Sequence, residues 1–285
     1  MTRFEGYYVK ACDGVNSVAV IFGCNKGKGS TSFIQVVTKD GSFNIDFEYA
    51  KYSASEKPFC VTVGENFACE KEMVLSTKEI SGRLRFGKFC PLKYDIMGYF
   101  KYFPFMECKH KVVSMHHTVS GQLAIGGRTY NFENAHGYIE GDCGHSFPQK
   151  YFWTQCGNFP TGQYLPVSVM ASAARIPYLG LRFLGTTCVV QIGQKQYRLA
   201  TYLGARIKTF GLAALVITQG RKLLKITAAE PHTAAHPLAA PAKGKMNRII
   251  KENIAATVNY KFSIGKKVIF DITSDRAAFE YSENN

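Results

Sequence analysis

Two acidic residues stand two positions apart near the middle of the chain, within the stretch 137–148. In an extended strand, Glu140 and Asp142 would point to the same face, because side chains alternate along a strand. Two carboxylates on one enclosed face repel each other, so at least one should stay protonated near neutral pH. A protonated carboxyl group beside aromatic residues is suited to donate a proton to an apolar substrate. The alternative is a polar hairpin whose acids pair with nearby Arg or Lys.

Aromatic residues that follow this acid pair, and others near the N-terminus, are candidates for the wall of a substrate-binding site. The only tryptophan, Trp153, follows within a strand-like segment, 151–156. Aromatic faces attract positive charge by ~0.5–2 kcal/mol each, so such residues suit a developing cation. Core packing is the alternative for Trp153 and Tyr7, and a buried hydrogen-bonded role is the alternative for His110. The predicted substrate-binding residues are Glu5, Tyr7, Tyr8, His110, Ser146, Phe147, Trp153 and Gln155.

Three other chemistries fit the sequence less well. A metal site would draw on His110, His116, His117 and Glu107, but vicinal histidines on a strand point to opposite faces and the spacing matches no standard site. A hydrolase reading of Ser146 lacks the Gly-x-Ser-x-Gly elbow. The glycine-rich stretch 23–30 lacks phosphate-loop spacing and indicates a hairpin loop instead. The spacing therefore predicts neither a metal site nor a phosphate-binding loop.

Length and charge limit the class of protein. The chain has 285 residues, which is near the size at which single cores divide. A net charge of +14 raises the question of nucleic acid or an anionic surface as partner. The basic residues are scattered and form no recognition motif. We predict a hydrophobic small molecule as partner and no specific nucleic acid. A peripheral contact with an anionic membrane surface also fits.

The nine cysteines include no CxxC pair. Residues 1–10 lack the apolar run of a signal peptide. An odd count of cysteines without such a signal predicts reduced thiols in a cytoplasmic protein. No transmembrane helix is expected.

Short alternating segments separated by turn signals run along most of the chain and predict an all-β barrel or sandwich. A weak echo between 7–20 and 151–170 supports two similar β halves, 1–119 and 120–285. The long segment 91–117 has few turn signals and is expected to cross a core or line a cavity. We expect a surface loop over 229–244 and a helical turn over 247–253.

Several motifs together resemble the tocopherol cyclase-like family, in its shorter bacterial form. They are the residues 4–10, 97–100, 104–110, 114–117, 137–142, 146–148 and 151–156, with weaker features at 246–248 and Glu252. The resemblance implies an architecture similar to the carotenoid hydratase and lipocalin-like superfamily, with two antiparallel β-barrel-like halves and an apolar cavity. It also implies a reaction in which a prenyl double bond is protonated and a phenol oxygen attacks the cation. That chemistry requires no redox cofactor and no metal.

Two functions follow from this resemblance. The first is a cofactor-independent cyclase or hydratase that acts on an isoprenoid-like substrate, with Glu140 or Asp142 as the proton donor. The second is a non-catalytic, lipocalin-like carrier of a hydrophobic small molecule. Solvent-exposed acids would favour the carrier, because a carrier has little reason to hold a carboxylate in an apolar pocket.

Overall fold

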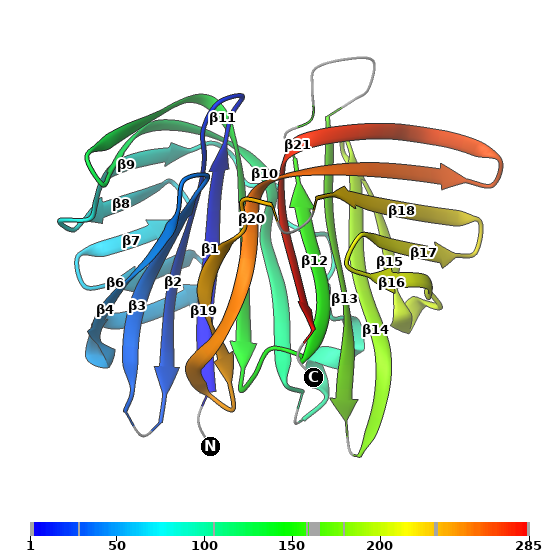
Figure 1. The fold of residues 1–285 in the computed structure, drawn as a ribbon, viewed down its shortest axis with the longest axis horizontal. Helices are drawn as coiled ribbons and strands as arrows, with labels where there is room; N and C mark the ends of the chain where they lie inside the picture. The colour runs from blue at the N-terminus through cyan, green and yellow to red at the C-terminus, as the bar shows by residue number, and fades with distance from the viewer. Residues whose placement is uncertain are drawn as a thin grey trace.

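The computed structural model describes residues 3–283 apart from residues 28, 105, 158, 160–165, 179 and 231–232, so Phe105 of the family motif lies outside the described part. Strands make up 73% of the structure and helix 4%, which confirms the all-β class. The strands form two antiparallel sheets that stand side by side (Figure 1).

The first sheet has eleven strands in the order β4-β3-β2-β1-β11-β10-β9-β8-β7-β6-β5. Its strands are β1 (Arg3–Cys12), β2 (Ser17–Lys26), β3 (Thr31–Thr38), β4 (Ser42–Glu48), β5 (Tyr52–Glu56), β6 (Phe59–Val63), β7 (Asn66–Cys69), β8 (Glu72–Ser76), β9 (Ile80–Phe86), β10 (Cys108–Ile125) and β11 (Arg128–Gly144). Two short 3-10 helices, η1 (Tyr49–Lys51) and η2 (Gly98–Tyr102), lie in its connections.

The second sheet has ten strands in the order β15-β14-β13-β12-β21-β20-β18-β17-β16, with β19 paired to β20 beside this path. Its strands are β12 (Lys150–Cys156), β13 (Val167–Tyr178), β14 (Leu181–Ile192), β15 (Lys195–Ala200), β16 (Arg206–Gly211), β17 (Ala214–Gln219), β18 (Lys222–Ala229), β19 (His236–Ala242), β20 (Lys245–Ile264) and β21 (Lys267–Glu283). The 3-10 helix η3 (Thr201–Leu203) follows β15.

The central strands of the first sheet, β1 and β11, are covered on both faces, and this explains why both sets of their alternating side chains include apolar residues. Val9 and Ile139 point into a core that belongs to the first sheet alone. Their neighbours Tyr8 and Tyr138 point the other way, into a third cluster that also holds residues of the second sheet. Alternation along a strand thus sends one set of residues into each half's own core and the other set into the space between the halves.

Each half sends a segment across to the other. The segment around η2 reaches the second half, where the Tyr202 hydroxyl donates to the carbonyl of Ile96 at 2.7 Å. The hairpin of β19 and β20 reaches the first half (Figure 1), where Gln35 exchanges two hydrogen bonds with the backbone of Ala239. Both crossing segments contribute residues to the lining of the space between the sheets. For 91–117, this confirms the expectation that the segment crosses a core or lines a cavity; the crossing of β19 and β20 was not predicted.

Three local expectations differ from the structure. The predicted boundary at 119/120 falls inside β10, and the chain passes between the sheets in the connection from β11 to β12. The predicted helical turn at 247–253 lies inside β20, because its residues pair with β19 and β21. The predicted loop at 229–244 contains β19, which pairs with β20 despite its prolines.

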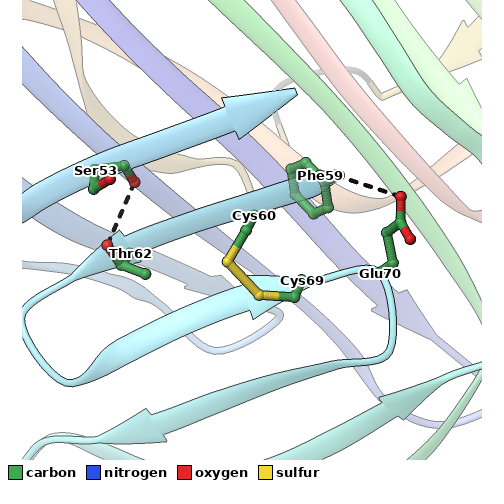
Figure 2. Close-up of a disulfide and its surroundings, with 6 residues drawn as sticks. All are labelled: Ser53, Phe59, Cys60, Thr62, Cys69 and Glu70. Carbon is green, nitrogen blue, oxygen red and sulfur yellow. Dashed lines mark hydrogen bonds between the residues drawn. A yellow bond between two sulfur atoms is a disulfide. The ribbon is translucent and has the colours of Figure 1, made fainter. Parts of the chain in front are cut away.

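The cysteines also depart from the expectation of reduced thiols. Cys60 and Cys69 stand directly opposite each other on β6 and β7 and form a disulfide (Figure 2). The Cα atoms of the two residues are 4.1 Å apart. The sequence alone does not reveal this pair, because the two cysteines become neighbours only when the hairpin of β6 and β7 forms. Within the described residues, no helix is long and apolar enough to cross a membrane.

Candidate active site

A cavity of about 200 Å³ lies between the two sheets. Apolar side chains make most of its wall, and they come from both sheets and from both crossing segments. They include Phe4, Met97, Phe100, Met106, Phe147, Leu238 and Ile250. An apolar cavity with a few convergent polar groups is the usual form of a small-molecule site.

His110 lies between the two predicted acids and contacts both. It stands directly opposite Asp142 in the ladder of β10 and β11, and its Nδ1 lies 3.0 Å from Asp142 Oδ1. Its Nε2 lies 3.4 Å from Glu140 Oε2. Both acids therefore share one face of β11, as alternation predicts.

Glu140 also accepts hydrogen bonds from two side chains, one on its own strand and one on β12. The Tyr138 hydroxyl donates to Glu140 Oε2 at 2.5 Å, and Trp153 Nε1 donates to the same oxygen at 3.3 Å. Only 5% of Glu140 is exposed. Once ionised, this carboxylate is therefore surrounded by groups that stabilise its charge.

Burial and charge shift the pKa values of this cluster in opposite ways. Burial raises the pKa of Glu140 from 4.5 to about 7, against the opposing effects of His110 and the two donors. Burial lowers the pKa of His110, but the charges of Glu140 and Asp142 outweigh it and raise the pKa from 6.5 to about 9. At neutral pH the cluster thus joins a charged imidazolium to an acid close to its titration point, which suits proton transfer.

A glycine separates the two acids for a steric reason. A Cβ added at Gly141 would lie 2.9 Å from Tyr7 Cδ1 and 2.9 Å from Lys111 Cε. Position 141 faces the core of the first sheet, where the Lys111 ammonium donates to the Tyr7 hydroxyl at 2.6 Å. Glycine thereby leaves room for the side chains of Tyr7 and Lys111, which pair with position 141 from β1 and β10, while Glu140 and Asp142 keep their face toward the cavity.

Five of the predicted binding residues line the cavity: Glu5, Tyr8, His110, Phe147 and Trp153. Three do not. Tyr7 faces the opposite way from Tyr8, into the first core, because the two are strand neighbours. The Ser146 hydroxyl donates to the carbonyl of Phe147, in the connection between the sheets. Gln155 lines a separate small pocket with Lys10 and Tyr138.

A second group of acids was not predicted as part of the site. Glu280 lines the cavity and accepts a hydrogen bond from the Tyr151 hydroxyl at 2.8 Å. Glu252 stands opposite Glu280 on the neighbouring strand and accepts a hydrogen bond from the Tyr8 hydroxyl at 2.5 Å. Burial raises the pKa of Glu252 from 4.5 to about 7. Burial and the charge of Glu252 also raise the pKa of Glu280 well above its usual value.

Among the described residues, one set places metal-binding atoms together. His110, Glu140 and Asp142 each offer one such atom, and these lie within 4.8 Å of one another. Both ring nitrogens of His110, however, face carboxylates. This favours the protonated ring, whereas a metal ligand must offer a lone pair. The earlier candidates His116 and His117 are absent from this set.

Fold and site together define a lipocalin-like β protein with a buried acid–histidine cluster in an apolar cavity. The chain belongs to the tocopherol cyclase-like family, whose model matches residues 62–282. A chloroplastic tocopherol cyclase of Zea mays is 34% identical over 110 residues, which are 39% of this chain and 21% of the maize protein. The match therefore spans about a fifth of that relative.

Solved structures of low identity share the fold. CghA with Sch210972 aligns with a TM-score of 0.60 at 9% identity, over 99% of this chain and 88% of that one. Kievitone hydratase from Nectria haematococca aligns with a TM-score of 0.54 at 10% identity, over 99% of this chain and 89% of that one. These likenesses show the fold alone.

Proposed function

We propose that the protein catalyses an acid-initiated cyclisation or hydration of an isoprenoid-like substrate held in the cavity. Glu140 is the proton donor. The protonated ring of His110, paired with Asp142, stabilises the carboxylate that Glu140 becomes when it gives up its proton. The observation that carries the proposal is the position of Glu140, a buried carboxyl group beside an apolar cavity, with two hydrogen-bond donors and the His110 ring around it. The names of the maize relative and of kievitone hydratase support a cyclase or hydratase reading.

The proposed steps balance without a cofactor. The Glu140 proton forms a new C–H bond at a double bond of the substrate and leaves a tertiary carbocation. A hydroxyl oxygen of the same substrate, or a water molecule, forms the new C–O bond. The proton that this oxygen loses returns to the Glu140 carboxylate, which His110, Tyr138 and Trp153 stabilise in the interval. The apolar wall limits the access of competing water.

A carrier would use the same cavity without chemistry. The burial of Glu140 favours the enzyme. A carboxyl group is costly to hold in an apolar cavity, and a carrier gains nothing from it, whereas an enzyme uses it as a proton donor.

Whatever the reaction, the hydrophobic ligand is expected to reach the cavity from an apolar environment. The net charge of +14 suits an anionic membrane surface as that source.

A panel of prenylated hydroquinones, incubated with the purified protein, tests the proposal. Turnover is expected with the wild type and should be lost in the double variant Glu140→Gln/Asp142→Asn, with the fold retained by circular dichroism. Mass spectrometry of molecules extracted from the purified protein adds a second readout. A bound lipid that is released unchanged, with no turnover of it or of the panel, would favour the carrier and contradict the enzyme.

A further inference from the structure

The cavity is acidic although the chain is basic. The sequence carries a net charge of +14. In contrast, five carboxyl groups line the cavity, and the described residues place no lysine or arginine in its wall. The acidic residues are Glu5, Glu107, Glu140, Asp142 and Glu280. Buried carboxylates are costly without partners, so each of these acids must either keep its proton or lie beside a positive charge.

Some of these acids have such a partner within the protein. Glu5 Oε1 lies 3.5 Å from the ammonium of Lys111. Glu140 and Asp142 share the imidazole of His110. These three acids are therefore accounted for by contacts inside the chain.

Glu107 and Glu280 differ, because neither forms an ion pair within the described residues. Glu107 lies within reach of the charges of Arg248 and Arg182, whereas Glu280 is bound by the Tyr151 hydroxyl alone. It stands directly opposite Glu252 on β20, and like charges that face each other across a ladder destabilise each other. Glu252 is fully buried, and its Oε2 has no hydrogen-bond partner in the part of the chain that the structure describes. Across this stretch of the described ladder, two facing acids thus lack a directly paired cation.

Aromatic rings complete the surroundings of Glu280. On its other side, Glu280 stands directly opposite Trp153 in the ladder of β12 and β21. The ring of Tyr8 meets the ring of Trp153 edge to face, with centroids 5.6 Å apart. Tyr8, Tyr151 and Trp153 line the cavity together with Glu280. Aromatic faces beside a carboxylate form a favourable site for an organic cation.

We propose that Glu280, supported by Glu252, is the counter-ion of a positively charged ligand atom in the cavity, and that the cavity binds lipophilic organic cations. This inference deepens the proposed function and rests on it for its catalytic meaning, since the tertiary carbocation of that reaction is such a species. A protonated tertiary amine is its stable analogue. Glu252 acts only through Glu280 and is a positioning residue.

The test compares two probes of similar shape in equilibrium binding. N,N-dimethyloctylamine is a cation at pH 7, and 2-methyldecan-2-ol carries a neutral tertiary centre on the same chain. The wild type is expected to bind the amine at least tenfold more tightly than the alcohol. Glu280→Gln should remove most of that preference and leave the affinity for the alcohol within about threefold. The control Glu283→Gln changes an exposed acid of the same strand, paired with Lys150, and should keep the preference.

A second measurement needs no variant. Amine binding should release protons from the Glu252–Glu280 pair, because the cation favours their ionised forms. Calorimetry in buffers of different ionisation enthalpy detects that release. Equal affinity for the two probes in the wild type, or amine binding without proton release, would overturn the proposal.

Failure of the cation-binding proposal can be distinguished from failure of the proposed reaction. Absence of the amine preference in the wild type, alongside turnover that depends on Glu140, would remove the counter-ion role and leave the reaction standing. A strong preference that depends on Glu280, without turnover of any prenylated hydroquinone, would leave the cation site standing and remove the reaction.

Discussion

His110 and Asp142 face each other across the ladder of β10 and β11, with Nδ1 and Oδ1 3.0 Å apart. This contact helps keep the imidazole protonated in spite of its burial. Asp142→Asn should therefore lower the pKa of His110 from about 9 toward the ordinary histidine value of 6.5. Titration of the histidine ring protons by NMR measures the change. Asp46→Asn, at an exposed position of the same sheet, is the control, and an unchanged His110 pKa in the Asp142→Asn variant would contradict the pairing.

The combined contribution of Glu140, Glu252 and His110 to stability should fall as pH rises from about 5 to about 9. The folded-state pKa values of Glu140 and Glu252 are raised from 4.5 to about 7, so their contribution is fully present below 4.5 and is lost as pH rises through about 7. The pKa of His110 is raised from 6.5 to about 9, so its contribution is fully present below 6.5 and is lost as pH rises through about 9. A tenfold difference in proton affinity between the folded and unfolded states corresponds to about 1.4 kcal/mol.

Urea unfolding at several pH values measures this dependence. Glu252→Gln should flatten the part of the curve between pH 5 and 7, because the amide does not titrate. The comparison with the wild type isolates Glu252 from the charge of the whole chain. A variant curve parallel to that of the wild type would show that Glu252 titrates normally in the folded protein.

Trp153 should report on occupancy of the cavity. It is the only tryptophan and lines the cavity, so a bound apolar ligand should change its emission. Ala174→Leu adds three carbons to the cavity wall and should weaken binding of a prenylated hydroquinone by about tenfold or more, since overpacking costs ~1–3 kcal/mol. Ala54→Leu, on the exposed strand β5, should leave affinity unchanged. Equal affinities in the two variants would place the ligand elsewhere.

The Cys60–Cys69 bridge should contribute to stability without affecting the cavity. The bridge closes a short loop, with a sequence separation of 9, and loops of this size contribute ~2–3 kcal/mol in the chain-entropy model. The double variant Cys60→Ser/Cys69→Ser should lower the unfolding free energy by about that amount and keep ligand binding. Mass spectrometry after alkylation gives a direct check. Two alkylated thiols at these positions in the unreduced protein would contradict the bridge.

The strand pattern was readable from the sequence because alternation and turn residues are local signals. The same rule placed Glu140 and Asp142 on one face, and the scarcity of turn signals over 91–117 indicated the crossing segment. Local patterns failed at 247–253, where pairing with β19 and β21 outweighs a short helical signal. Alternation shows that Tyr7 and Tyr8 point to opposite faces, but it could not show which of the two reaches the cavity.

Long-range pairing explains why the second acid group was missed. Tyr8 and Glu252 are separated by 244 positions, and Tyr151 and Glu280 by 129. No spacing rule connects residues so far apart, and a single glutamate in a long strand resembles an ordinary surface acid. The one available signal was Glu252 within the weaker family features of the second half.

The central claim is that Glu140 gives its proton to a double bond of the substrate. The most direct measurement is deuterium transfer in single-turnover reactions with a prenylated hydroquinone in deuterated water. The wild type and the control Glu133→Gln, which changes an exposed acid of the same strand as Glu140, should place one deuterium on carbon in the product. Glu140→Gln should slow that transfer by about 10²–10⁴-fold with the fold intact. Transfer at the wild-type rate in Glu140→Gln would contradict the account.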